Sequence, residues 1–318
     1  MFELETVFLD NFDYTKAESF FNFSLENFEG MSFAAIELLS NCENLTRFHL
    51  IDRNSNKVVA QAVVAYKKIR LPIGVAKVAF LTHVVVPHVY RNQGMATRLI
   101  RLITPHLQNS GTEIVILIAR RAVKDFYYKL GYLGFCKFVD FKGVIGENLQ
   151  ACIGSLKPSN YESLIKIRHA FDFTYVRNYK TISRDEIYWL NLLKYKQFEI
   201  HNYECRHGFY YVILNKTNGK VIEIAGTSDN YDCILQVIKT NNYILDQITN
   251  RHPALSSLRS QPFEFKFRFE RKQAHMFKII TFPRTKTGFK LAIELYVQSL
   301  SKGLFPQRNI IILPADQV

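Results

Sequence analysis

Cysteine is scarce in this chain of 318 residues, with five residues that are widely spaced and odd in number. None of them forms a Cys-x-x-Cys pair, and no Cys/His cluster suggests a metal site, so we expect no bound metal. A small secreted domain held together by disulfides would carry paired, closely spaced cysteines. The scattered cysteines instead favour a reducing compartment, and we expect a cytoplasmic protein.

Long apolar runs are missing too. No stretch of about 18 consecutive apolar residues occurs, which predicts that no helix spans a membrane. The amino-terminal stretch is acidic and interrupted by charges, unlike a secretory signal. Acidic residues are fewer than basic ones. The chain has 28 Asp and Glu and 41 Lys and Arg, which gives a net charge of +13. This balance favours an anionic partner such as a coenzyme, nucleic acid or an acidic membrane surface, although a solvated basic surface has the same composition.

The chain is long for one hydrophobic core, so two domains are expected, residues 1–150 and 151–318. In the first, alternating and β-branched runs predict strands, and apolar spacing predicts helices between them. The second repeats this coarse order of helices, hairpin, helix and strand, with Asn218-Gly219 as a hairpin turn. The expected helices are 14–29, 31–39, 95–102, 122–129, 159–170, 183–194, 231–239 and 291–300. The expected strands are 47–52, 57–66, 80–86, 112–118, 133–141, 208–214, 221–224, 263–269 and 309–313.

One stretch organises the first half. A β-rich run ends at Pro87, a short polar loop follows, and a helical pattern begins after Gly94. In such a strand-loop-helix unit the loop amides and the positive end of the helix converge, which favours a bound phosphate. The stretch has neither the Gly-Lys-[Ser/Thr] of a Walker loop nor the first glycine of a dinucleotide fingerprint. The stretch therefore matches neither of these two patterns.

Two motifs carry a family resemblance. The spacing Val86-Pro87-x-x-Tyr90-Arg91-x-x-Gly94-x-Ala96 resembles motif A of the GNAT superfamily of N-acetyltransferases. Downstream, residues 126–135 (FYYKLGYLGF) resemble its motif B. The resemblance implies an α/β (α+β) fold, a GNAT-type mixed sheet flanked by helices. Since the second half repeats the pattern without motif A, the chain also resembles the tandem acetyltransferases of the enhanced-intracellular-survival type, with a degenerate GNAT-like second domain.

The resemblance implies acetyl-CoA as co-substrate and a primary amine as acceptor. The pyrophosphate would lie on the loop amides, and the pantetheine amides would pair with the free edge of the central strand. The residues expected to contact acetyl-CoA are Val84, Val85, Val86, Arg91, Asn92, Gln93, Gly94, Met95, Ala96 and Thr97. The acceptor stays open between a small amine, an antibiotic, a peptide terminus and a protein lysine.

Tyr127 and His83 are the candidate catalytic residues. Tyr127 matches the tyrosine that lies near the CoA sulfur in the family, where it would stabilise the departing thiolate. Several members carry a glutamate base at the position of Phe80, which cannot act as a base. His83, three residues along, has a suitable pKa, but strand alternation places it on the opposite face from Phe80, and a structural, hydrogen-bonded histidine is the alternative.

Two other functional classes remain. Phe80 and Arg120 stand where catalytic or contact residues often occur, which would suit a catalytically inactive acyl-CoA-binding regulatory protein. The positive charge and the basic-aromatic run 265–272 would suit a module associated with nucleic acid, although a half-buried strand with a basic solvated face has the same pattern.

Overall fold

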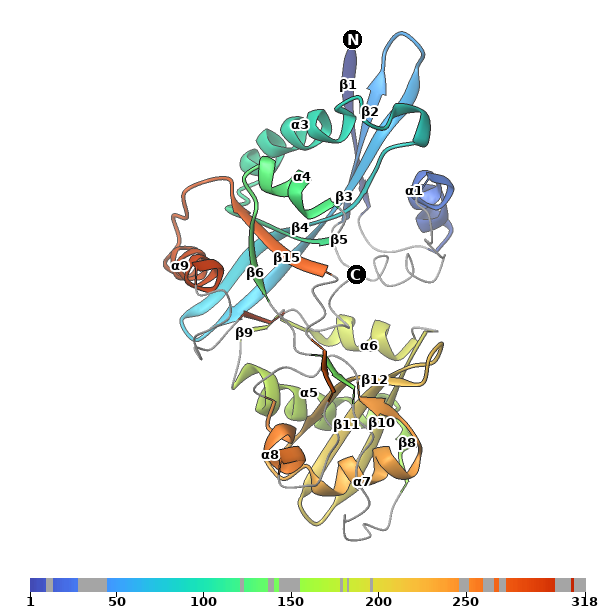
Figure 1. The fold of residues 1–318 in the computed structure, drawn as a ribbon, viewed down its shortest axis with the longest axis vertical. Helices are drawn as coiled ribbons and strands as arrows, with labels where there is room; N and C mark the ends of the chain where they lie inside the picture. The colour runs from blue at the N-terminus through green and yellow to red at the C-terminus, as the bar shows by residue number, and fades with distance from the viewer. Residues whose placement is uncertain are drawn as a thin grey trace. The chain divides into compact units, whose positions relative to one another are not determined.

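The computed structural model describes residues 1–9, 14–27, 45–120, 123–136, 140–142, 155–177, 180–181, 183–194, 197–245, 252–259, 266–268, 273–300 and 310–311. The chain divides into two compact units, which Figure 1 shows in colours that run along the sequence. Unit 1 comprises residues 1–136 and 273–305 together with Val318, and unit 2 comprises residues 137–272 and 306–317. The helix expected at 31–39 lies outside the described residues.

Unit 1 is built on a seven-stranded mixed sheet in the order β1-β2-β3-β4-β5-β15-β6. Strands β4 and β5 are parallel and the other neighbours are antiparallel. Helix α3 (Met95–Asn109) makes the crossover that a parallel pair requires. The strands are β1 (Phe2–Leu9), β2 (Leu45–Asp52), β3 (Lys57–Leu71), β4 (Gly74–Val85), β5 (Ile114–Arg120), β6 (Leu133–Cys136) and β15 (Gln273–Ile279).

Strand β15 shows where the structure differs from the expected division at residue 150. It lies between β5 and β6, and helix α9 (Lys286–Leu300) follows it and packs against β4 and β6. Strand β5 is buried along most of its length, so the backbone groups on its outer edge need a partner strand. Residues 273–279 provide it, and the segment 273–305 therefore belongs to unit 1.

The two faces of this sheet are covered by different helices (Figure 1). On one face α3 and the short α4 (Lys124–Lys129) lie over a core that includes Leu81 and Leu117. Leu99, Ile100, Ile103 and Leu107 form the apolar stripe of α3. Helix α1 (Tyr14–Asn27) lies on the opposite face, where its buried Phe20 and Phe21 meet the sheet.

Unit 2 contains a five-stranded sheet in the order β13-β12-β11-β10-β8. Its strands are β8 (Lys157–Pro158), β10 (Phe198–Cys205), β11 (Gly208–Asn215), β12 (Lys220–Gly226) and β13 (Ile244–Leu245). Its helices are α5 (Leu164–Phe171), α6 (Glu186–Lys194), α7 (Asp232–Thr240) and α8 (Ala254–Arg259), and a π-helical turn, Asp172–Val176, extends α5.

The topology of unit 2 repeats that of unit 1. A strand, intervening helices, three antiparallel strands, a crossover helix and a parallel strand follow one another in both sheets. Thus β8, β10, β11, β12 and β13 correspond to the first five strands of unit 1, and α7 corresponds to α3. The predicted hairpin at Asn218-Gly219 joins β11 and β12, with Gly219 at φ 64°. The predicted repeat of element order is therefore present in unit 2, and its kinship with the GNAT domain stays a prediction.

Two further strand pairs complete unit 2. Strand β7 (Asp140–Lys142) pairs with β14 (Lys266–Arg268), and β9 (Lys180–Thr181) pairs with β16 (Ile310–Ile311). The strand expected at 133–141 is thus two strands, since β6 ends at Cys136.

A buried ion pair lies in unit 2. The Arg184 guanidinium donates to both Glu223 carboxylate oxygens, at 2.7 and 2.8 Å, and both side chains are fully buried. The Tyr211 hydroxyl donates to the same carboxylate at 2.6 Å. The rings of Phe171 and Trp189 lie 4.5 and 4.9 Å from the guanidinium carbon. Burial of its hydroxyl, with the Glu223 charge beside it, raises the pKa of Tyr211 well above its ordinary value.

The cysteines differ from expectation in one respect. Among the described residues Cys205 is a free thiol, whereas Cys233 is disulfide-bonded. A disulfide at Cys233 does not fit the reducing compartment that the cysteine spacing favoured. The cytoplasmic location loses that support and stays a prediction.

Candidate functional site

The parallel strands β4 and β5 part in the middle of the sheet. They are paired only from Ala79 to Leu81, although β4 continues to Val85 and β5 to Arg120. Beyond Leu81 the facing edge of β4 therefore has no strand partner in the described sheet. An extended ligand with its own amide groups can bind there as an added strand would.

A β-bulge shapes the same end of β4. Val63 pairs with Thr82 and Gln61 pairs with Val85, so β4 has one more residue than β3 between these two pairs. His83 lies within the bulge at φ 47°, a left-handed conformation that is uncommon for a residue with a side chain. The bulge removes backbone groups from the regular ladder with β3. It leaves residues 83 and 84 between the paired residues Thr82 and Val85.

The loop after β4 has the backbone of an anion site. After Pro87 a single 3-10 turn, His88–Tyr90, leads to Asn92 and Gly94, both left-handed at φ 61° and 77°. Such alternation turns successive N–H groups toward one side of the chain. Residues 95–97 form the first turn of α3, where the amides have no partner within the helix, and the N-cap Gly94 has no side chain to cap them. The positive end of the helix dipole adds to the attraction for an anion.

Side chains of this loop hold it to the strand. The Nε of Arg91 donates to the carbonyl of Val86 at 3.2 Å, and the Gln93 side-chain amide donates to the carbonyl of Val89 at 2.9 Å. A Cβ built on Gly94 would meet nothing within 4 Å, so the space above it is open. The residues predicted to contact the coenzyme thus lie at the end of β4, in the loop after it and in the first turn of α3. The structure adds that the carbonyl of Val86 accepts one hydrogen bond from Arg91.

Tyr127 lies on the α3 side of the sheet. It belongs to α4 and is buried, with its ring edge-on to Phe126 at 4.9 Å and to Tyr132 at 5.7 Å between centroids. Burial raises the pKa of Tyr127 to about 12. Within the described part of the chain its hydroxyl has no hydrogen-bond partner, which leaves it able to donate to a ligand.

His83 lies on the opposite face of the sheet from Tyr127. Its ring packs edge-on against Phe21 of α1, 5.4 Å between centroids, while Tyr127 belongs to the core under α3. Phe80, flanked by Ala79 and Leu81 of that core, also faces away from α3. The expectation that His83 and Phe80 face opposite sides is therefore wrong, because the extra residue of the bulge shifts the alternation.

The surroundings of His83 also differ from those of a hydrogen-bonded structural histidine. Its Nδ1 is buried and has no hydrogen-bond partner among the residues that the structure describes. Burial lowers the pKa of His83 to about 4, so the ring is neutral near pH 7. Phe80 is a core residue with the Lys67 ammonium 4.8 Å from its ring centroid, and it offers no acid-base group.

A polar network on the α1 face was missed by the sequence analysis. His49 on β2 lies with Nδ1 3.1 Å from the Glu5 carboxylate and with Nε2 2.8 Å from the Gln61 side-chain oxygen. The Gln61 amide in turn donates to the hydroxyl of Ser24 on α1. Desolvation by burial is the main cause that lowers the pKa of His49. Gln61 is the strand partner of Val85, so the network reaches the bulged end of β4.

These features define the class of the protein. A mixed sheet whose central parallel strands part beside an anion-binding loop is the arrangement of the GNAT fold. Residues 12–134 match the family model described as an acetyltransferase (GNAT) domain, the family that the two sequence motifs resemble. No curated protein matches the chain in sequence.

In each match to a solved structure with the same fold, the matched part covers most of this chain and most of the other protein's chain. A probable N-acyltransferase from Enterococcus faecalis has a TM-score of 0.64 at 13% identity, over 88% of this chain and 73% of its own. Eis1 from Mycobacterium abscessus has a TM-score of 0.58 at 16% identity, over 87% and 74%. The N-myristoyltransferase of Saccharomyces cerevisiae, solved with bound myristoyl-CoA, has a TM-score of 0.53 at 10% identity, over 87% and 82%. At these identities the likeness shows the fold.

Two features are absent from the described residues. None of their helices combines the length and the apolar character that crossing a membrane requires. They also contain no group of three or more His, Cys, Asp and Glu side chains arranged to hold a metal ion.

Proposed function

We propose that the protein transfers an acetyl group from acetyl-CoA to a primary amine of an acceptor still to be identified. The observation that carries the proposal is the direct continuity of two features in unit 1. The unpaired edge of β4 beyond Leu81 leads straight into the loop whose amides precede α3. One ligand that has both amide groups and a pyrophosphate would match both features.

The loop and the strand edge would bind different parts of that ligand. The amides of Gly94 to Thr97 would hold the pyrophosphate, where the helix dipole favours negative charge. The edge at Val84 and Val85 would pair with the pantetheine amides. Arg91, through its hydrogen bond to the Val86 carbonyl, would keep loop and strand in register.

Tyr127 would act on the leaving group by hydrogen bonding. Its pKa of about 12 lies well above that of a thiol, so full proton transfer to the thiolate would be uphill. With a thiol pKa near 8.5, the difference corresponds to about 5 kcal/mol. Tyr127 is therefore proposed to donate a hydrogen bond to the thiolate as it forms, with protonation completed later by solvent.

His83 would orient the amine and would not act as the general base that removes its proton. A group whose pKa is lowered to about 4 cannot take a proton from an ammonium with a pKa near 10.4. Its neutral ring has a buried, unpartnered Nδ1 on the face opposite Tyr127. We propose that His83 accepts a hydrogen bond from the incoming neutral amine, and that water removes the amine proton.

Release of the CoA thiol in the presence of a panel of amines tests this function. We expect release that depends on one class of amine and that saturates with acetyl-CoA. Tight CoA binding without amine-dependent release would instead support a regulatory acyl-CoA-binding protein, the alternative that the inert Phe80 leaves open. Absence of CoA binding would overturn both.

A further inference from the structure

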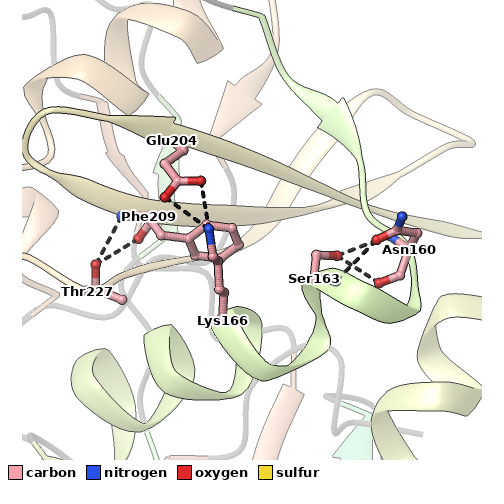
Figure 2. A network of polar contacts seen from close by, with 6 residues as sticks. All are labelled: Asn160, Ser163, Lys166, Glu204, Phe209 and Thr227. Atoms are coloured by element: carbon pink, nitrogen blue, oxygen red, sulfur yellow. Dashed lines mark hydrogen bonds and ion pairs between the residues drawn. The ribbon is translucent and has the colours of Figure 1, made fainter.

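Unit 2 has a pocket of its own, with a volume of about 470 Å3. Helix α5 forms one wall, the tight turn between β10 and β11 forms another, and Thr227, which follows β12, closes the end (Figure 2). Pockets of this size hold small organic molecules and are larger than a single ion needs. The lining residues are Ile165, Lys166, His169, Glu204, Cys205, Arg206, His207, Gly208, Phe209 and Thr227.

The pocket lies at the end of the unit 2 sheet that corresponds to the coenzyme loop of unit 1, but on the α5 side, and Thr227 is the one lining residue from the equivalent loop. Thr227 directly follows β12, the strand that corresponds to β4, and the loop that contains it leads into α7, the counterpart of α3. Ligands of open α/β sheets bind outside the carboxyl ends of such strands. The second unit thus has a cavity at the equivalent end of its sheet, although its loop has no motif A.

The walls of the pocket are held by specific contacts. Ahead of α5, Asn160 and Ser163 cap each other, with the Ser163 amide donating to Asn160 Oδ1 at 3.1 Å and the Asn160 amide donating to Ser163 Oγ at 3.0 Å (Figure 2). The Thr227 hydroxyl accepts from the Phe209 amide at 3.0 Å. A Cβ on Gly208, at φ 146°, would lie 2.7 Å from that hydroxyl oxygen, so glycine is what allows this closure.

The charges that face the pocket are unequal. Its one carboxylate, Glu204, is paired through both oxygens with the Lys166 ammonium at 3.0 and 2.9 Å (Figure 2). Arg206 donates its Nε to His207 Nε2 at 3.1 Å, and its two terminal nitrogens have no partner among the described residues. His169 likewise has no hydrogen-bond partner in that part of the chain. One guanidinium fork therefore remains uncompensated beside the apolar surfaces of Ile165 and Phe209.

We propose that this pocket binds a small organic phosphate, a phosphate group joined to an apolar or aromatic body. The terminal nitrogens of Arg206 suit two phosphate oxygens in a bidentate arrangement. His169 would donate to a third oxygen, and Phe209 with Ile165 would contact the apolar body. The site is separate from the acetyl-CoA loop of unit 1 and does not depend on the function proposed for it.

Calorimetric titration of the full chain with phenyl phosphate, inorganic phosphate and benzoate at equal ionic strength tests the proposal. We expect one phenyl phosphate per chain, bound more tightly than inorganic phosphate or benzoate. Benzoate binding as tightly as phenyl phosphate would overturn the phosphate assignment, and no binding of phenyl phosphate at millimolar concentration would overturn the site. Binding that is lost in Gly94→Ala would place the ligand in the unit 1 loop and would also overturn the site.

Variants that change the charge of the pocket should change the affinity for phenyl phosphate in opposite directions. Arg206→Gln removes the guanidinium fork and should weaken phenyl phosphate binding by roughly tenfold or more. Glu204→Gln removes the only carboxylate in the lining and releases Lys166, so it should strengthen binding. Arg168→Gln is the control, since Arg168 lies on α5, next to the lining residue His169, but contacts Glu186 at 3.9 Å outside the pocket. Equal effects of the two arginine variants, or weaker binding in Glu204→Gln, would contradict the proposal, and unchanged thermal unfolding of each variant excludes misfolding.

Discussion

Helix α3 is flanked by two glycines in nearly the same conformation, which permits a closely matched test of the coenzyme loop. Gly94 precedes the helix at φ 77° and Gly111 follows it at φ 78°, and a Cβ at either position would meet nothing within 4 Å. Alanine in this left-handed conformation costs roughly 1–2 kcal/mol wherever it is placed. Gly94→Ala and Gly111→Ala should therefore lower the free energy of unfolding by similar amounts.

Their effects on CoA should differ. At Gly94 the methyl group would stand in the open space where the phosphate approaches the backbone, whereas Gly111 is at the far end of the helix. Loss of one charge-assisted amide-phosphate hydrogen bond, about 1.5–3 kcal/mol, corresponds to a ten- to hundredfold weaker affinity. Calorimetric titration with CoA, together with urea unfolding of each variant, measures both quantities. Wild-type affinity in Gly94→Ala, or an equal loss of affinity in Gly111→Ala, would refute the assignment of the loop.

Four further predictions concern other parts of the chain. Tyr127→Phe should lower kcat by roughly tenfold or more while CoA affinity stays near the wild-type value, because the hydroxyl acts on the thiolate. Arg184→Met leaves a buried carboxylate without its partner and should lower the free energy of unfolding by about 3–5 kcal/mol in urea titrations. Removal of residues 151–318 deletes β15 and should leave an unfolded chain by circular dichroism, whereas replacement of 137–272 by a short hairpin linker should keep unit 1 folded, since β6 and β15 are antiparallel neighbours. His252 is neutral in the folded protein with a pKa lowered to about 4, and it takes up a proton on unfolding below pH 6.5. The free energy of unfolding should then fall between about pH 6.5 and 4, by roughly 1.4 kcal/mol per pH unit for this group, with a shallower fall in His252→Gln.

Each of these has a clear contrary result. An unchanged kcat in Tyr127→Phe would leave the hydroxyl only a packing role. A methionine at position 184 that stabilises the protein would show that the ion pair is replaceable by apolar packing. A folded chain ending at residue 150 would contradict the place of β15 in the sheet. An identical pH slope in His252→Gln would assign the pH dependence to other groups.

The sequence predicted well those parts of the fold that depend on neighbouring residues. The strand before Pro87, the loop and helix α3 are local features whose residues set their own backbone, and the structure confirms them. Strand β15 was missed, because residues 273–279 do not alternate clearly and their role is to fill a gap between strands distant in sequence. The segment predicted as a strand at 263–269 is described only at Lys266–Arg268, where it pairs with β7.

The candidate site shows the same limit. The motif located Tyr127 on α4 next to the core of the parting strands, since its position follows from a local helix. The orientation of His83 could not be derived, because a bulge depends on the register between two strands and leaves no mark in the alternation. The pairing of Glu5 with His49 joins residues 44 positions apart, and only the polar alternation of 47–52 hinted at it.

The two topologically equivalent loops explain why we assign acetyl-CoA to unit 1 alone. In unit 2 the amides at the start of α7 are already bonded, Asn230 to the Ser228 hydroxyl at 3.2 Å, Tyr231 to the Ser257 hydroxyl at 3.2 Å and Asp232 to the Asn230 side chain at 3.0 Å. Asp232 also brings a carboxylate into the first helical turn, where its negative charge disfavours a phosphate. The corresponding amides before and within the first turn of α3 have no capping side chain and no acidic neighbour. A duplicated fold can thus keep its topology while one copy satisfies its own helix end and the other leaves that end for a ligand.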